Sequence, residues 1–258
     1  MAQLSKGILR TGTSNIVVPG TKNSFPEEFQ SRTRLHYYAT LFNSLEVNTS
    51  FYKVPMAKTF ARWATEVPQG FQFTVKLWKG ITHAKGLQYA PIDIDSFMQA
   101  ASFLGDKKGC LLIQFPASIT VEYADKLASI LARVKAADPE SSWRIAVELR
   151  HMNWYNPVIY SLLDTYNASL VLHDMPASKP AVTNKKAPFI FLRFHGEAGD
   201  YRGSYSPRFL HAKARQIKSW LSEGRDVYAY FNNTIGAAYD NARTLQQLVN
   251  KRSRVKQH

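Results

Sequence analysis

Short apolar runs alternate with segments of helical period along the whole chain. The apolar runs predict eight strands, at residues 7–13, 44–48, 71–77, 109–115, 143–149, 168–173, 189–195 and 226–232. The periodic segments predict helices at residues 32–42, 58–66, 95–104, 121–137, 157–166, 207–223 and after residue 234. Strands that alternate with helices are typical of repeated βα units around a parallel sheet.

Eight such units predict an α/β fold with a single (β/α)8 barrel. The segment after the sixth strand is rich in Pro and Lys without helical period, so its helix is expected to be irregular or missing. No linker-like stretch interrupts the pattern, which predicts one domain over residues 1–250 and a frayed basic tail over 251–258. A doubly wound sheet is less favoured, because no glycine fingerprint follows the first strand.

Most of the predicted strands turn polar at one end. These ends carry Glu46, Asn48, Lys76, Gln114, Glu148, Arg150, His173, Asp174, Arg193, His195, Tyr230 and Asn232. Residues two apart in a strand share a face, and the active sites of barrels lie at the carboxyl ends of the strands. The pattern therefore predicts a functional site at this rim. The alternative is that these charges pair internally, for instance Glu148 with Arg193 and Glu46 with Lys76.

The charge balance narrows the class of partner. Lys and Arg number 33 against 19 Asp and Glu, a net charge of +14, which favours an anionic small molecule or nucleic acid. The single cysteine, Cys110, excludes an internal disulfide and a cysteine-cluster metal site. No apolar run reaches the length of a signal peptide or membrane span, so a cytoplasmic protein without a membrane partner is expected; the pattern leaves the oligomeric state open.

Several motifs resemble one known family. They are SLEVNTSFYKVP (44–55), FTVKLWKGITH (73–83), LLIQFP (111–116), AVELRHMNWY (146–155), LRFHG (192–196) and VYAYFNNTIGAAYDNA (227–242). Together they are similar to the YecE-like family, domain of unknown function family 72. The resemblance implies a TIM-barrel-like fold without an established activity. Members usually carry GTSGW after the first strand, where this chain has GTSN (12–15).

Acid/base catalysis on an anionic substrate is the favoured interpretation, performed by a hydrolase or lyase without a cofactor. Glu148 is the candidate base and His195 or His173 the candidate acid, while Arg193 and Lys76 hold the anion. The remaining candidates for substrate binding are Glu46, Asn48, Tyr52, Gln114, Arg150, Asp174, Tyr205, Tyr230, Asn232 and Asn233. The glycine-rich segment 196–205 is expected to be a mobile loop that closes over the ligand.

Two other functions remain open. Aromatic residues interleaved with cations in the rim loops, such as Tyr52 beside Lys53, suit a non-catalytic nucleic-acid or nucleotide-binding barrel. The acidic residues and histidines of the rim also suit a divalent-metal-dependent phosphoester hydrolase. Arg150 and Arg193 on the same faces argue against a bound cation.

Overall fold

Eight parallel strands form one sheet in the computed structural model, which describes residues 6–251. The strand order is β1-β8-β7-β6-β5-β4-β3-β2. The strands are β1 (Leu9–Thr13), β2 (Ser44–Val47), β3 (Gln72–Lys76), β4 (Lys108–Gln114), β5 (Arg144–Glu148), β6 (Ala168–His173), β7 (Ile190–Phe194) and β8 (Val227–Phe231). Each neighbouring pair is parallel, so all carboxyl ends meet at one rim.

The first and second strands meet and nearly close the barrel. Ser14 forms an isolated parallel bridge with Glu46, and the Asn15 N–H donates to the Glu46 carbonyl at 2.7 Å. A Cβ atom on Gly12 would lie 2.1 Å from the Ser44 carbonyl oxygen. Only glycine therefore permits this approach of β1 to β2. The predicted barrel fold is confirmed.

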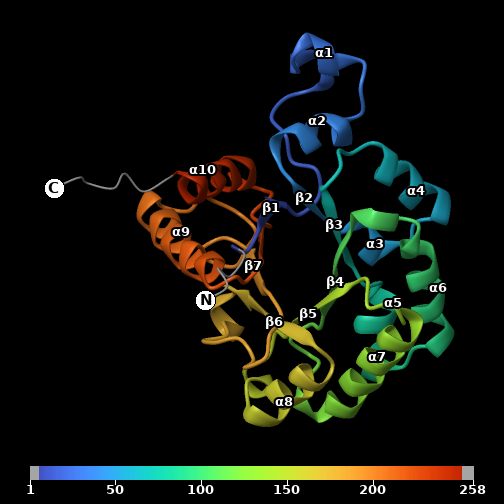
Figure 1. Cartoon of the computed structure of the whole chain (residues 1–258). Coiled ribbons are helices and arrows are strands. Elements are labelled where there is room, and N and C mark those ends of the chain that lie inside the picture. Colours follow the sequence, from blue (N-terminus) through green and yellow to red (C-terminus); the bar gives the residue numbers. More distant parts are fainter. Residues whose placement is uncertain (1–5, 252–258) are drawn as a thin grey trace, which may run out of the picture.

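The helices lie outside the ring of strands (Figure 1). They are α1 (Glu27–Gln30), α2 (Arg34–Leu41), α3 (Thr49–Tyr52), α4 (Ala57–Thr65), α5 (Lys79–Thr82), α6 (Pro91–Ser102), α7 (Ala124–Ala137), α8 (Pro157–Thr165), α9 (Pro207–Ser222) and α10 (Ala238–Asn250). The connection from β6 to β7 contains only a 3-10 turn, Pro176–Ser178. The prediction of an irregular or missing helix there is confirmed.

The core has two parts, one between the sheet and the helices and one inside the barrel. The interior residues are Cys110, Leu112, Ala146, Val171, Phe189, Phe191, Tyr228 and Tyr230, all buried. Their alternation along the strands places every second side chain inside the barrel. At the carboxyl rim the same inward positions are filled by charged residues, so the polar layer rests on an apolar one.

Side chains near the starts of α6 and α10 contribute differently to these two helix ends. Pro91 begins α6, so Asp93 lies in its first turn, where the carboxylate accepts from the Ala90 N–H at 3.2 Å, and Asp95 instead pairs with Arg133. The helix α10 begins four residues beyond Thr234, and neither Thr234 nor Asn233 caps it. Proline at the first helical position set the start of α6, because its fixed φ suits that position.

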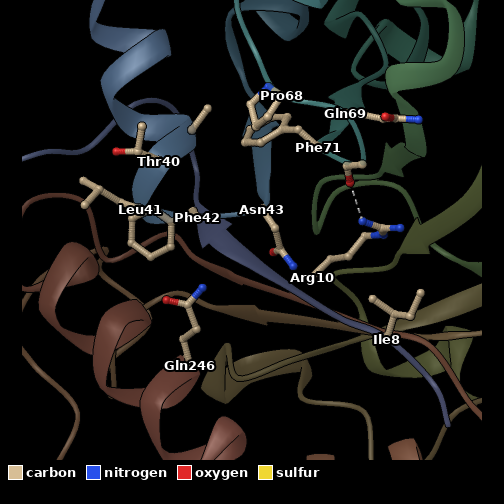
Figure 2. A pocket seen from close by; sticks show the side chains of 12 residues that line it. Ile8, Arg10, Thr40, Leu41, Phe42, Asn43, Pro68, Gln69, Phe71 and Gln246 are labelled. Carbon is tan, nitrogen blue, oxygen red and sulfur yellow. Dashed lines mark hydrogen bonds between the residues drawn. The ribbon is translucent and has the colours of Figure 1, made fainter. Parts of the chain in front are cut away.

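A hollow of about 490 Å³ lies at the amino end of the barrel, opposite the charged rim (Figure 2). Its polar side chains already serve the fold: Arg10 Nη1 donates to the Gly70 carbonyl at 2.9 Å, and Asn43 Nδ2 donates to the Leu9 carbonyl at 2.8 Å. These contacts tie β1 to its neighbours. We assign the hollow a structural role, as is usual for this end of a barrel. In residues 6–251 no helix has the length and apolarity needed to cross a membrane.

Candidate active site

A buried ion-pair layer forms the floor of the rim. Arg193 at the end of β7 donates from Nε and Nη2 to both Glu46 oxygens, at 2.8 and 2.7 Å, and from Nη1 to Glu148 Oε2 at 2.6 Å. Arg193 is 1% exposed and both glutamates are fully buried. The predicted internal pair of Glu148 with Arg193 is therefore confirmed, whereas Glu46 pairs with Arg193 and not with Lys76. None of these three residues offers an accessible atom to a ligand.

Arg150 lies above this floor. Its Nε donates to Glu148 Oε1 at 2.6 Å, and Nη1 donates to the Tyr201 hydroxyl at 3.0 Å. Burial alone would raise the pKa of Glu148, but the charges of Arg150 and Arg193 outweigh it and hold that pKa well below its ordinary value. Glu148 is consequently a weak base in this arrangement.

His195 is held as a neutral ring. Its Nε2 lies 2.9 Å from Arg150 Nη2, which can only donate, so Nε2 accepts and the proton resides on Nδ1, 3.3 Å from Asp174 Oδ1. Burial lowers the pKa of His195 to about 4 despite the opposing hydrogen bond to Asp174. The Tyr205 hydroxyl donates to the other oxygen of Asp174 and accepts from the Gly196 N–H. Asp174 and Tyr205 thus position His195, and His195 positions Arg150.

His173 is also engaged on both ring nitrogens. Nε2 lies 3.1 Å from the Leu149 carbonyl and Nδ1 accepts from the Met175 N–H at 3.3 Å, which fixes the neutral Nε2–H form. Burial lowers its pKa. The Tyr155 hydroxyl, which the sequence did not single out, lies 3.1 Å from the same Nε2. These contacts join the ends of β5 and β6.

Lys76 at the end of β3 differs from every other charged residue of the cluster. It is 8% exposed, and its Nζ lies 3.8 Å from the centre of the Phe51 ring. The carboxylates of the floor pair with Arg193 and Arg150 instead. Burial, with the added repulsion of Arg193, lowers the pKa of Lys76 to about 7. The ring face favours the ammonium form and so limits this decrease.

His83 faces the same corner of the rim. Its ring lies 4.8 Å from that of Phe51, and Nδ1 lies 2.9 Å from the Thr82 hydroxyl. Burial and the charge of Lys76 lower the pKa of His83 to about 4. A neutral imidazole next to an amine of low pKa makes this corner distinct from the arginine-rich centre.

Some of the remaining predicted residues lie at the border of the charged cluster. Asn48, whose Oδ1 is buried without a partner in residues 6–251, follows β2 directly and precedes the first residue of α3. Gln114 donates to the Phe115 carbonyl at 2.7 Å, and Asn232 is 9% exposed at the end of β8. These three residues border the cluster.

Three other predicted residues lie outside the ion-pair layer, although the Tyr52 ring lies 5.1 Å from that of Phe51. The Tyr230 hydroxyl forms a hydrogen bond with the Ser44 hydroxyl inside the barrel, below the charged layer. The Asn233 side-chain amide donates to the Gly203 carbonyl and to Asn241 Oδ1. Tyr52 is 66% exposed on α3. As ligand contacts all three stay predictions.

The loop after β7 is tied to the loop after β8. The Tyr201 N–H donates to the His195 carbonyl at 2.7 Å, and the Ala237 N–H donates to the Gly203 carbonyl at 3.0 Å. These backbone contacts hold the Tyr201 hydroxyl against Arg150. The mobility expected of segment 196–205 stays a prediction.

Sequence reasoning missed Ser14, Phe51 and His83. Ser14 donates to Glu46 Oε1 at 2.5 Å. It stands two residues after Gly12, just beyond the end of β1, so strand periodicity could have indicated it. Phe51 lies on the one-turn helix α3 and His83 directly follows α5, and the spacing within such short elements does not indicate which way a side chain points. In residues 6–251 no group of three or more His, Cys, Asp or Glu side chains is arranged to hold a metal ion, so the metal-hydrolase alternative has no ligand set there.

Fold and site together define a class: a TIM-barrel protein with a buried arginine–glutamate network under its carboxyl rim. The family model described as "Protein of unknown function DUF72" matches residues 10–258, and the chain belongs to this family. It is 24% identical to the UPF0759 protein YunF of Bacillus subtilis over 87% of this chain and 89% of the relative. It is 26% identical to the UPF0759 protein YecE of Escherichia coli, over 48% of this chain and 43% of the relative.

Solved structures show the same fold. A DUF72 family protein from Enterococcus faecalis superposes with a TM-score of 0.76 at 22% identity, covering 95% of this chain and 97% of that one. A DUF72 family protein from Thermotoga maritima superposes with a TM-score of 0.75 at 22% identity, covering 95% and 100%. The resemblance drawn from the motifs is confirmed.

Proposed function

We propose that this protein is an enzyme that binds an anionic, phosphate-containing substrate at the carboxyl rim and transfers a proton through the Lys76 amine. The observation that carries the proposal is the isolation of Lys76. Lys76 is buried at the barrel mouth, faces an aromatic ring and forms no salt bridge with a carboxylate among residues 6–251. A group whose pKa lies near the working pH exchanges protons most effectively, and the pKa of Lys76 is about 7.

The other candidate acids and bases already form hydrogen bonds and ion pairs with one another. Glu148 accepts from two arginines, and His195 is clamped between Arg150 and Asp174. A lone pair that already accepts from a guanidinium is a poor acceptor of a substrate proton. Glu148 and His195 therefore support the site by orienting Arg150. A direct role for Glu148 as the base and His195 as the acid is less favoured.

Substrate binding rests on Arg150 and its neighbours. A guanidinium has five N–H donors, of which Arg150 uses three on Glu148, Tyr201 and His195, and this leaves two for an anion. Its side chain is 13% exposed, in contrast to Arg193. These two donors on a partly exposed side chain fit a small anion that reaches the rim from solvent.

The test is a turnover screen on phosphorylated sugars and phosphoesters with the wild type, Lys76→Met and a control, Lys126→Met, on the exposed part of α7. We expect a product with the wild type and the control, and a rate about 10²–10⁴-fold lower with Lys76→Met. Turnover that survives Lys76→Met contradicts the assignment. An absence of any product, together with nucleic-acid binding that weakens steeply with salt and is indifferent to Lys76→Met, would establish the non-catalytic nucleic-acid-binding alternative instead.

A further inference from the structure

The surroundings of Lys76 suit covalent chemistry as well as proton transfer. We propose that the Lys76 amine forms an imine with the carbonyl group of an anionic aldehyde or ketone. This inference rests on the proposed function, because it uses the same rim and the same anion-binding groups. It adds a substrate class, a carbonyl compound that carries a carboxylate or phosphate.

The first support is the local geometry of the amine. Lys76 Nζ lies 3.8 Å from the centre of the Phe51 ring, and the backbone behind it is fixed because the Ser50 hydroxyl donates to the Lys76 carbonyl at 2.8 Å. An aromatic wall excludes water on one side and stabilises a cation on its face. A protonated imine is such a cation, so this environment fits the adduct as well as the free ammonium.

The second support is that Lys76 forms no salt bridge with any residue in the described range 6–251. Glu46 and Glu148 are the nearest buried carboxylates, and Arg193 holds both at 2.6–2.8 Å. A lysine paired with a carboxylate is kept protonated and unreactive, whereas a desolvated lysine near other cations is a nucleophile. The buried arginine thus frees the amine, which gives a chemical reason for a guanidinium in the barrel interior.

The third support is the position of the anion-binding groups. Arg150 retains two unused N–H donors at the same rim, and Arg193 and Arg150 both act on Lys76 through their charges. A substrate anion held by Arg150 would lie at the same rim as the Lys76 amine. Positioning of this kind converts the encounter into an intramolecular reaction.

The bond changes balance without any further reactant. The nitrogen lone pair of Lys76 forms a C–N bond to the carbonyl carbon, and the π pair of the C=O bond moves to the oxygen. The two amine protons then pass to that oxygen, which leaves as water. The products are an imine and water, and no oxidant or reductant takes part.

Selectivity over the other lysines follows from the free-amine fraction. With a pKa of about 7, half of Lys76 is unprotonated at pH 7. A surface lysine with a pKa of about 10.4 has roughly a thousandfold smaller fraction at that pH. Other lysines of the same chain therefore serve as internal controls in one sample.

The test is reductive trapping with glyoxylate and cyanoborohydride at pH 7, followed by intact mass and peptide mapping of the full chain. We expect a single reduced adduct on Lys76, formed at least tenfold faster than on any other lysine and slowed by inorganic phosphate. The decisive readout comes from the wild type, so it does not depend on the folding of a variant. Lys76→Arg provides a second sample in which the fast adduct disappears.

Other results would separate this inference from the proposed function. Equal labelling of all accessible lysines, with Lys76 no faster than the rest, overturns the imine. If Lys76→Met nevertheless abolishes turnover of a phosphorylated substrate, the proton-transfer function stands and the imine alone is wrong. A fast adduct on Lys76 that phosphate does not slow supports the nucleophile and contradicts anion binding beside it.

Discussion

Replacing Arg193 with Met removes one guanidinium from two buried carboxylates. Glu148 keeps Arg150 at 2.6 Å, whereas Glu46 keeps only the Ser14 hydroxyl and backbone contacts. Removing one partner of a buried ion pair typically costs about 3–5 kcal/mol, because the remaining charge is desolvated without compensation. We expect Arg193→Met to lower the free energy of unfolding by about that amount at pH 7.

The measurement is urea denaturation at pH 7, followed by circular dichroism. The double variant Glu46→Gln/Arg193→Met should recover more than half of the loss at pH 7. Arg62→Met is the matched control: Arg62 pairs with Glu66 at 3.5 Å with 67% of its side chain exposed, and should change stability by less than about 1 kcal/mol.

Equal losses of stability from Arg193→Met and Arg62→Met would contradict charge compensation at the rim. A loss from Arg193→Met that the second substitution at Glu46 leaves unchanged would contradict it as well. Either result would mean that packing of the arginine stem, and not charge compensation, holds the rim together.

Three further predictions concern pH and backbone. The pKa of His195 is about 4 in the folded chain and about 6.5 in the unfolded chain, so the unfolded state binds more protons between these two pH values. The free energy of unfolding should therefore fall by up to about 3 kcal/mol as the pH drops from 6.5 to 4. In His195→Gln the midpoint of urea unfolding should depend less on pH over that window. Gly196→Ala should destabilise more than Gly203→Ala, since both have φ above +70° but only at Gly196 would the new Cβ lie 2.5 Å from the Arg202 carbonyl, and thermal midpoints compare them. Asn15→Gly should change the free energy of unfolding in urea by less than about 1 kcal/mol. Glycine favours the φ of 61° at this position, and this gain offsets the loss of the hydrogen bond from the Asn48 N–H to Asn15 Oδ1.

The barrel could be predicted because its signals are local. Apolar runs bounded by charged ends mark strands, and parallel strands bring those ends to one rim whatever the loops do. Glu148 with Arg193 could be foreseen as an internal pair for this reason. The departure of Asn15 from the family motif is also intelligible: the position needs a positive φ, and asparagine is among the residues that tolerate it.

The division of roles within the rim could not be predicted. Strand periodicity places Glu46, Lys76 and Arg193 on inward faces but does not say which acid the arginine takes. That choice depends on the length of the arginine side chain. Arg193 extends from β7 far enough to bind both glutamates, so Lys76 has neither as a partner and packs against Phe51. Phe51 lies on the one-turn helix α3 and His83 directly follows α5, and the direction of such short connecting elements follows from tertiary contacts and not from spacing.

The central claim is that Lys76 is the reactive group of this barrel, and titration of its amine tests that claim most directly. Competitive acetylation across pH 5–11, with peptide mapping, reports the protonation of each lysine separately in the intact protein. The structure predicts a midpoint of about 7 for Lys76, with surface lysines near about 10.4. A midpoint for Lys76 that coincides with that of the surface lysines would contradict its role as the reactive group, because the amine would then be protonated and unreactive at neutral pH.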